Sequence, residues 1–225
     1  VWMDGIQVMA ARDREGSTEG LYVAAKGGHN AESHNHNDVG NFIVYIDGKP
    51  VIIDIGVETY SRKTFSAQRY EIWTMQSAYH SLPTIDGVMQ SPGRQFAARN
   101  LGYRSDDAMA QLTLDIAGAY PEQAHLKSWA RTITLNRGRD VTVTEAYTLT
   151  EPVGQITLSL MTPCRAEARR PGQIVLATSN DDESAQVLYD PTQLAATIEV
   201  VDVEDGRLRT VWPEKIARIV MKADK

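Results

Sequence analysis

The residues whose types could do chemistry gather in SHNHNDVGNF, residues 33–42, where His34 and His36 stand two positions apart among small polar residues. The apolar run that follows leads to Asp54, and His80 lies in SAYHSLPTIDG further along the chain. Neutral imidazole and carboxylate groups together suit zinc, which often keeps one coordination position open. These residues therefore suggest a divalent metal site, provided that the fold brings them together.

A predicted β-hairpin brings Asp54 toward His36. Asp47-Gly48 is a favoured two-residue turn between two apolar runs, and continuous pairing outward from it places Asp54 opposite Asn41. Both faces of this strand pair are apolar, so we expect the pair to lie inside the fold. A charged carboxylate at the end of a buried strand pair needs a partner, which a metal ion would supply.

The candidate third ligand is His80, because the Asp86-Gly87 turn that follows it is expected to return the chain to the same sheet. If the segment is extended, His34 points the same way as His36, two positions further on. His34 is then either a fourth ligand or a catalytic group beside the metal. From spacing alone, histidines in a hydrogen-bonded polar loop remain the alternative. His29 and His125 have no matching partners and are interpreted as ordinary surface or packing residues.

The elements that must position these residues are mainly β-strands. Short apolar or alternating runs, each typical of a strand, cover residues 20–27, 40–47, 49–56, 81–90, 110–120, 130–150, 154–162, 172–178 and 195–203. Such a density of strands predicts an all-β fold, a multi-stranded antiparallel β-sandwich, and we interpret residues 1–225 as a single domain.

Turn signals separate these runs, and two segments differ from them. Hairpin turns are predicted at Asp47-Gly48, Asp86-Gly87, Asn136-Arg137-Gly138 and Asp205-Gly206. Residues 61–79 have mixed spacing, which indicates a helical turn or an irregular loop. Residues 179–186, SNDDESAQ, are charged and poor in apolar residues, which predicts an exposed loop.

Composition narrows the class of protein. A hydrophobic content of 42% is enough for a real core, and the net charge of −6 argues against nucleic acid as a partner. No apolar run approaches the roughly 20 residues that span a bilayer, and the first residues lack the pattern of a signal peptide. The single cysteine, Cys164, excludes an internal disulfide. The chain starts at Val1 with a strand-like run, so we expect it to be a portion of something longer.

At this point the motifs resemble those of a known family. His-x-His-x-Asp occurs at 34–38, Asp-x-Gly at 54–56, Arg-Tyr at 69–70, and Ser-x-x-His followed by Thr-x-Asp-Gly at 77–87. Together and in this order they resemble the C-terminal β-sandwich domain of the heparinase II/III-like polysaccharide lyases. The resemblance is specific over about 20–95. One departure is Ser81, where the family usually has Asn; it affects a local hydrogen bond and not the ligand.

The resemblance implies a set of roles. Zinc or a similar divalent ion is held by His36, Asp54 and His80, while His34 is the catalytic residue turned toward substrate. Arg69 and Tyr70 help to bind an acidic sugar; the alternatives are a surface ion pair for Arg69 and core packing for Tyr70. The implied chemistry is β-elimination from a uronic acid, in which the sugar carboxylate is neutralised before a base removes the neighbouring proton.

The resemblance also implies partners. The substrate is an acidic polysaccharide such as heparin, heparan sulfate or alginate, and the active site is completed by an N-terminal α/α toroid that supplies a tyrosine. The isolated chain is therefore expected to bind metal and to show little lyase activity, and a homodimer and a periplasmic or secreted location in a bacterium fit the family. One alternative is a noncatalytic carbohydrate-binding or structural β-sandwich. Another is a metal-dependent enzyme of the cupin type, whose usual ligand spacing this chain does not reproduce.

Overall fold

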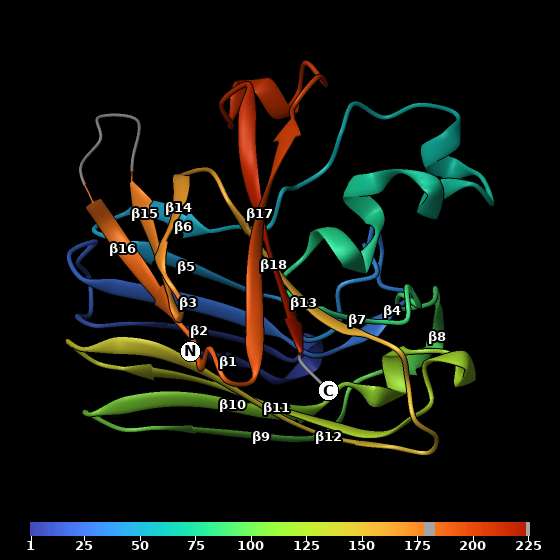
Figure 1. Ribbon diagram of the computed structural model, residues 1–225, viewed down its shortest axis with the longest axis horizontal. Helices are drawn as coiled ribbons and strands as arrows, with labels where there is room; N and C mark the ends of the chain where they lie inside the picture. The colour runs from blue at the N-terminus through green and yellow to red at the C-terminus, as the bar shows by residue number, and fades with distance from the viewer. Residues whose placement is uncertain (178–182, 224–225) are drawn as a thin grey trace.

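The computed structural model describes residues 1–177 and 183–223. Figure 1 shows that the chain is built almost entirely from strands joined by short 3₁₀ turns. The strands are β1 (Trp2–Met3), β2 (Val8–Arg12), β3 (Leu21–Lys26), β4 (His29–Asn30), β5 (Phe42–Ile46), β6 (Lys49–Ile52), β7 (Pro83–Ile85), β8 (Gly93–Ala97), β9 (Arg99–Ser105), β10 (Met109–Asp115), β11 (Leu126–Asn136), β12 (Asp140–Leu149), β13 (Ile156–Thr162), β14 (Arg165–Arg170), β15 (Gln173–Ala177), β16 (Glu183–Leu188), β17 (Leu194–Asp202) and β18 (Lys215–Ala223).

The turns lie mainly at one end of the strands. They are η1 (Asp4–Ile6), η2 (Lys63–Phe65), η3 (Arg69–Glu71), η4 (Trp73–Met75), η5 (Ser77–Tyr79), η6 (Ala117–Ala119), η7 (Glu122–Ala124) and η8 (Leu208–Thr210). The segment 61–79 therefore forms consecutive 3₁₀ turns, which agrees with the predicted turn or irregular loop. In the part of the chain that the structure describes, no helix is long and apolar enough to cross a bilayer.

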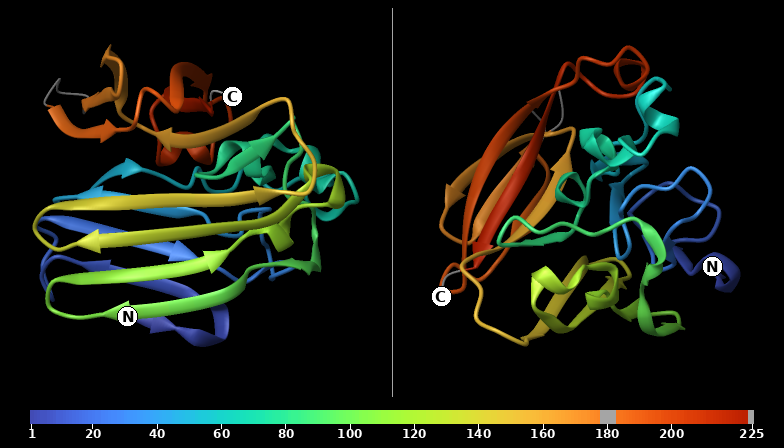
Figure 2. Two further views of the ribbon diagram at one scale, coloured as in Figure 1. Left: turned by 60° about the horizontal axis from the view of Figure 1, so that its bottom comes forward. Right: turned by 90° about the vertical axis from the view of Figure 1, so that its right-hand side faces the viewer.

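The strands form antiparallel sheets, as predicted. The larger sheets have the orders β1-β2-β3-β5-β6, β12-β11-β10-β9 and β17-β18-β13-β7, and smaller sheets have the orders β14-β15-β16 and β4-β8. Figure 2 shows the strands β13 to β18, orange to red, as a separate layer over the stacked pair formed by the first two sheets. The fold is thus all-β and sandwich-like.

The core forms between the facing sheets. Strand β10 alternates in burial, with Leu112 and Leu114 inside, and its neighbour β11 places Ile133 opposite Leu112. These side chains pack in one cluster with Met9 from β2 on the facing sheet. Fully burying a side chain of this size stabilises the fold by about 1.5–3 kcal/mol, so the two-residue period of the sequence fixes which face of each strand points inward.

The predicted register of the β5–β6 hairpin is only partly right. The pairs Ile46–Lys49 and Tyr45–Pro50 are as predicted, but the register then shifts so that Val44 pairs with Ile52. An extra residue in one strand forms a bulge and lets consecutive side chains turn to the same side, and here both Val51 and Ile52 are buried. The bulge follows Pro50, which has no backbone N–H to continue the ladder. The prediction that Asp54 pairs with Asn41 in strand register is therefore wrong.

Besides the Asp47-Gly48 turn, two further turn predictions are confirmed and one is wrong. Ile85 and Val88 close the Asp86-Gly87 turn, and β11 and β12 are joined through residues 137–139. Asp205-Gly206 is not a two-residue hairpin turn, because β17 ends at Asp202 and β18 begins only at Lys215. The Asp205 carboxylate instead accepts hydrogen bonds from the backbone N–H groups of Arg207 and Leu208 at the start of η8.

Several strands have no counterpart among the predicted runs, namely β2, β4, β8, β9, β14, β16 and β18. In β14 the charged residues Arg165, Glu167 and Arg169 are exposed, so the apolar pattern of a half-buried strand is weak there. Strand β16 contradicts part of the loop predicted over 179–186, because residues 183–188 pair with β15. The rest of that predicted loop, 179–182, lies outside the described residues.

Candidate metal centre

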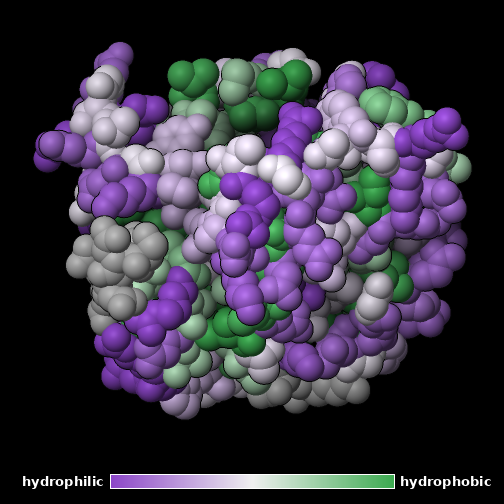
Figure 3. Space-filling view, turned by 90° about the horizontal axis from the view of Figure 1, so that it is seen from above, coloured by the Kyte–Doolittle hydropathy of each residue, from purple (hydrophilic) through white to green (hydrophobic). Residues whose placement is uncertain are grey.

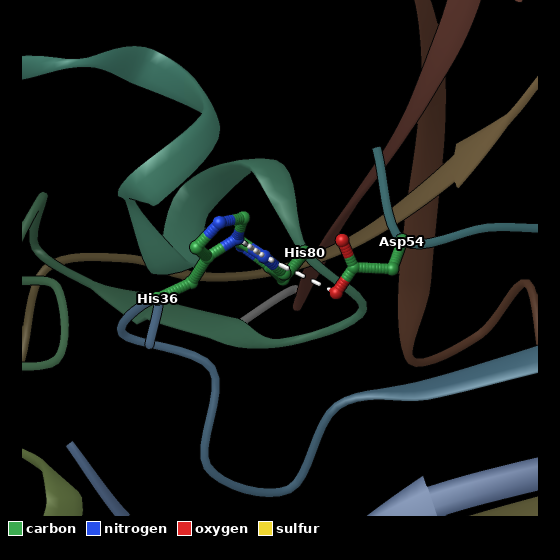
Figure 4. A group of neighbouring side chains, drawn as sticks. All are labelled: His36, Asp54 and His80. Atoms are coloured by element: carbon green, nitrogen blue, oxygen red, sulfur yellow. Dashed lines mark hydrogen bonds and ion pairs between the residues drawn. The ribbon is translucent and has the colours of Figure 1, made fainter. Parts of the chain in front are cut away.

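Three side chains from separate segments meet at one point, as Figure 4 shows. His36 lies in the loop between β4 and β5, Asp54 lies just beyond β6, and His80 ends η5. His36 Nδ1 is 3.2 Å from His80 Nε2, and His80 Nε2 is 3.5 Å from Asp54 Oδ2. One candidate ligand atom from each residue lies within 4.8 Å of the others. The structure thus brings together the three residues that the sequence pattern selects.

The hydrogen bond made by Nδ1 of His80 determines which atom of the ring carries its proton. His80 Nδ1 lies 2.8 Å from the carbonyl oxygen of Gln76, which can only accept, so Nδ1 carries a proton. In neutral His80 the Nε2 atom then presents a lone pair toward a carboxylate oxygen and a second imidazole nitrogen. A proton on His80 Nε2, a proton on His36 Nδ1 or a cation can occupy the space between these atoms.

Two of the three separations between the candidate ligand atoms fit a metal ion. Zinc binds imidazole nitrogen and carboxylate oxygen at about 2.0–2.2 Å, so two ligands on a tetrahedral zinc are roughly 3.3 Å apart. The measured separations of 3.2 Å and 3.5 Å lie on either side of that value. The donor set of two imidazoles and one carboxylate leaves a fourth position for water or another ligand.

The electrostatics favour the protonation states that bind metal. Burial lowers the pKa of His36, and the neighbouring His80 lowers it further, so the imidazole is neutral near pH 7. Burial acts to raise the pKa of Asp54, but His80, His36 and the Gly56 N–H outweigh it, and the pKa is lowered overall. His80 is fully buried, whereas 32% of the Asp54 side chain is exposed. The centre therefore has one face open to solvent.

Asn41 connects two of the candidate ligands. Its Nδ2 donates to Asp54 Oδ2 at 2.9 Å, and its Oδ1 accepts from the backbone N–H of Ser81 at 2.9 Å. Hydrogen bonds of this kind orient metal ligands. The predicted proximity of Asn41 and Asp54 is thus correct even though their strand pairing is not. The hydroxyl of Ser81, the position that departs from the family pattern, is buried without a hydrogen-bond partner in the described ranges.

A buried amide fixes the loop that carries His36. Gln90, 4% exposed, donates from Nε2 to the carbonyl of Val39 and accepts at Oε1 from the N–H of Val39, so it replaces a strand partner for that residue. Asn30 and Asn37, both buried, also donate to Gln90. The sequence analysis missed these residues; only Gln90, which follows the apolar pair Val88-Met89, left a signal.

His34 does not lie beside His36. Its backbone has φ +59°, so the segment is not extended there, and the expectation that both imidazoles point the same way is wrong. The side chain is exposed and stacks on Tyr60 with ring centroids 6.0 Å apart, with Tyr60 Oη 3.4 Å from its Nδ1. Phe65, 68% exposed, lies edge-on to Tyr60. His34 therefore faces outward and is not part of the triad.

The upper face of the molecule is mostly hydrophilic, with separate apolar patches, as Figure 3 shows. The residues 53–79 and the hairpin of β17 and β18 lie on this upper side of the molecule (Figure 1). Tyr60 and Phe65, which form the ring contacts beside His34, belong to this stretch of residues 53–79.

Arg69 and Tyr70 are engaged with the loop that carries His36. Arg69 donates from Nε and Nη2 to the carbonyl of Asn35, at 3.3 Å and 2.7 Å, and from Nη1 to the carbonyl of Thr64 at 2.9 Å. Tyr70 donates its hydroxyl to Asn35 Oδ1 at 3.2 Å. Both side chains thus hold the residue before His36, a contact that the sequence analysis did not foresee.

Comparisons with known proteins identify the family. The family described as "Heparinase II/III-like, C-terminal" matches residues 5–221. Three solved structures illustrate the fold. They are a heparinase III, the BT4657 gene product (13% identity, 96% of this chain, 31% of that chain, TM-score 0.73), heparan sulfate lyase HepC from Pedobacter heparinus (17%, 91%, 31%, 0.70) and a further heparinase III (14%, 98%, 33%, 0.71).

The chain spans about a third of the length of these structures. No curated protein sequence matches it. The family match covers nearly all of the chain, and the strand arrangement agrees with that of the solved structures. The chain belongs to the heparinase II/III-like C-terminal family.

Proposed function

We propose that this chain is the β-sandwich part of a polysaccharide lyase that cleaves uronic-acid-containing acidic glycans by β-elimination, and that it holds a divalent metal ion, most favourably zinc. The observation that carries the metal centre is the convergence of His36 Nδ1, His80 Nε2 and Asp54 Oδ2, with the proton of His80 placed on its other nitrogen. The lyase activity is supported by membership of the family.

Within this proposal the metal is structural. His36, Asp54 and His80 hold it, and when bound it supplies a fixed positive charge that joins two loops and the end of β6. The neutral imidazole of His36 and the ionised carboxylate of Asp54 need no deprotonation to bind it, which suits a site occupied at neutral pH.

His34 is the residue proposed to act on the substrate. When Tyr60 donates its hydroxyl hydrogen to His34 Nδ1, the proton of the neutral ring lies on Nε2. That N–H can donate to the carboxylate of a uronic acid and reduce its negative charge. The proton on the adjacent carbon then becomes more acidic, so a base can remove it while an acid protonates the departing glycosidic oxygen.

The remaining groups come from outside this chain in the proposal. An N-terminal α/α toroid supplies the tyrosine that moves the proton, and the acidic polysaccharide binds between toroid and sandwich. Three of the five N–H groups of Arg69 donate to backbone carbonyls within this chain. The other two can donate to substrate, so Arg69 makes only a minor contribution to substrate binding.

Metal analysis of the purified chain tests the centre. We expect about one zinc per chain and a fall in thermal stability when a chelator removes it. His36→Ala is expected to lose the metal, whereas His29→Ala, which changes a histidine paired with Glu32, keeps it. A chain without stoichiometric metal and unaffected by chelation would support the alternative of a noncatalytic sandwich module.

The lyase activity is tested in a protein that joins this chain to the toroid. Heparan sulfate and alginate serve as substrates, and the unsaturated uronate product is followed by its ultraviolet absorbance. We expect His34→Ala to lower kcat by roughly 10²–10⁴-fold with the metal retained. The isolated chain should show little activity; efficient product formation by it would refute the proposed division of the active site.

A further inference from the structure

Arg131 of β11 is buried against the backbone of Gly40 and Ser81, close in the chain to two of the candidate ligands. Its side chain is 2% exposed and lies on the inward face of the strand, in the row that also contains Trp129 and Ile133. The guanidinium lies 5.8 Å from the centre of the Phe42 ring on the facing sheet. An arginine in this position must satisfy its charge and its donors inside the core.

The partners of Arg131 divide into two groups. On one side Nε and Nη2 donate to Glu145 Oε1 at 2.9 Å and 2.5 Å, and Glu145 also accepts from the Trp129 indole N–H at 2.6 Å. On the other side Nη1 donates to the carbonyls of Gly40 and Ser81, at 2.7 Å and 2.6 Å. Glu145 therefore balances the charge and orients the guanidinium, so that Nη1 faces two backbone carbonyls.

These two carbonyls belong to the segments that hold the candidate ligands. Ser81 follows His80 directly, and Gly40 precedes Asn41, whose side chain bonds to Asp54 and to the N–H of Ser81. Arg131 and Asn41 thus join the same two segments, one through backbone carbonyls and one through the amide. Gly40 has φ +87°, and a Cβ there would lie 2.7 Å from Ile116 Cγ2, so this close approach requires glycine.

We propose that Arg131, held by Glu145, is a positioning residue for the metal centre: it sets the distance between the Gly40-Asn41 and His80-Ser81 segments and so the separation of the ligand atoms. The inference rests on the proposed metal centre. Lysine cannot replace arginine in this role, because a single ammonium lacks the planar fork that reaches a carboxylate and two carbonyls at once.

A purely structural role would have different consequences. Buried ion pairs contribute little net stability and can often be replaced by apolar residues. A structural Arg131 would affect the free energy of unfolding of the metal-free chain and leave the affinity of the folded chain for metal unchanged. A positioning Arg131 changes the metal affinity and the geometry at the metal.

The experiment compares Arg131→Lys with Leu135→Ala in the chain of residues 1–225. Leu135 is fully buried on the same strand, nearer the β11–β12 turn, so its truncation opens a cavity away from the centre. Urea unfolding of the chelated proteins measures stability, competition with a chromophoric chelator measures zinc affinity, and the visible spectrum of the cobalt-loaded protein reports ligand geometry.

We expect Arg131→Lys to weaken zinc binding by roughly 10–100-fold, the range found for residues that orient metal ligands, and to change the cobalt spectrum. Leu135→Ala should lower stability with zinc affinity and spectrum as in the wild type. Equal zinc affinity and an unchanged spectrum in Arg131→Lys would overturn the inference.

Glu145→Gln covers the case in which Arg131→Lys does not fold. It keeps an acceptor for Arg131 but removes the charge, and we expect a several-fold loss of zinc affinity with a changed cobalt spectrum; wild-type values would refute the positioning role. If the wild-type chain binds no zinc, the proposed metal centre fails and the inference fails with it. Binding by the wild type with no effect in both variants contradicts only the inference.

Discussion

The two ends of the β5–β6 hairpin each carry an aspartate, and the two carboxylates are in different situations. At the tip, Asp47 and Gly48 form the turn with φ +50° and +74°, and Asp47 Oδ1 accepts from the backbone N–H of Gly20 at 2.7 Å. At the open end, Asp54 accepts from Gly56 N and Asn41 Nδ2, yet its Oδ2 also faces His80 Nε2.

The comparison separates a structural carboxylate from a candidate ligand. Asp47 has a donor and solvent, so nothing further is needed to balance its charge. Asp54 has donors as well, but one of its oxygens points at an atom that is an acceptor in neutral His80. The lesson is that a metal site is indicated less by the number of histidines and carboxylates than by acceptors that face one another.

Removing His80 should give the largest effect at the open end. Binding energies of about 10–16 kcal/mol for structural zinc are shared among a few ligands, so His80→Ala should weaken zinc binding by roughly 1,000-fold. Zinc at 100 times its Kd raises the free energy of unfolding of the wild type by about 2.7 kcal/mol, and this gain should vanish in the variant. Titration calorimetry and urea unfolding with and without zinc measure both.

His125→Ala is the matched control for that change. His125 lies 3.6 Å from the exposed Glu151 and far along the chain from the ligands, so zinc affinity should stay at the wild-type value. A similar loss in both variants would mean that zinc binds histidines nonspecifically, and the contrast between the two ends of the hairpin would disappear.

Asn41→Leu should have the next largest effect. The variant removes the donor to Asp54 Oδ2 and the acceptor for the Ser81 N–H, so two ligands lose their common support. Loss of such an orienting residue typically costs about 10–100-fold in metal affinity. Chelator competition measures the change, with Asn136→Leu, at the exposed end of β11, as the control. An unchanged affinity would show that the ligands keep their positions without Asn41.

The sequence predicted the convergence of His36, Asp54 and His80 better than it predicted the contacts that hold these residues. Residue type and the Asp47-Gly48 turn were enough to bring Asp54 near His36, because a carboxylate at the end of an apolar hairpin needs a partner in any register. The bulge after Pro50 was not predictable from alternation alone, since Val51 and Ile52 are both apolar and either could face inward.

Contacts between segments far apart in the chain could not be predicted from residue type and spacing either. The left-handed conformation of His34 depends on the local loop, and no spacing rule signals it. Arg131 did leave a signal, because it takes the place of an apolar residue in the inward row of β11, between Trp129 and Ile133. Its carbonyl partners, Gly40 and Ser81, lie on other segments and follow only from the packing of the sheets.

Arg69→Ala tests whether Arg69 stabilises the loops around the open end of the hairpin. The variant leaves the carbonyls of Asn35 and Thr64 without their charged donor, and hydrogen bonds to charged groups contribute about 1.5–3 kcal/mol each at most. Because Arg69 is partly exposed, we expect a loss of about 2 kcal/mol in the free energy of unfolding, measured by urea denaturation of the metal-free chain. Wild-type stability would favour the substrate-binding role that the family resemblance implies.

The smallest effect is expected at the hairpin tip, from Asp47→Ala. Alanine removes the acceptor for the Gly20 N–H and is less tolerant than aspartate of a positive φ, so the free energy of unfolding should fall by about 1 kcal/mol. In a domain of this size that corresponds to a decrease of about 2–4 °C in Tm, which calorimetry resolves. Asp47→Asn keeps an acceptor and tolerates the left-handed region, so its free energy of unfolding should fall by less.

Zinc affinity should not change in either variant, because the tip carboxylate faces a donor and no second acceptor. A change in zinc affinity would show that the two ends of the hairpin are coupled, and that the distinction between their carboxylates is incomplete.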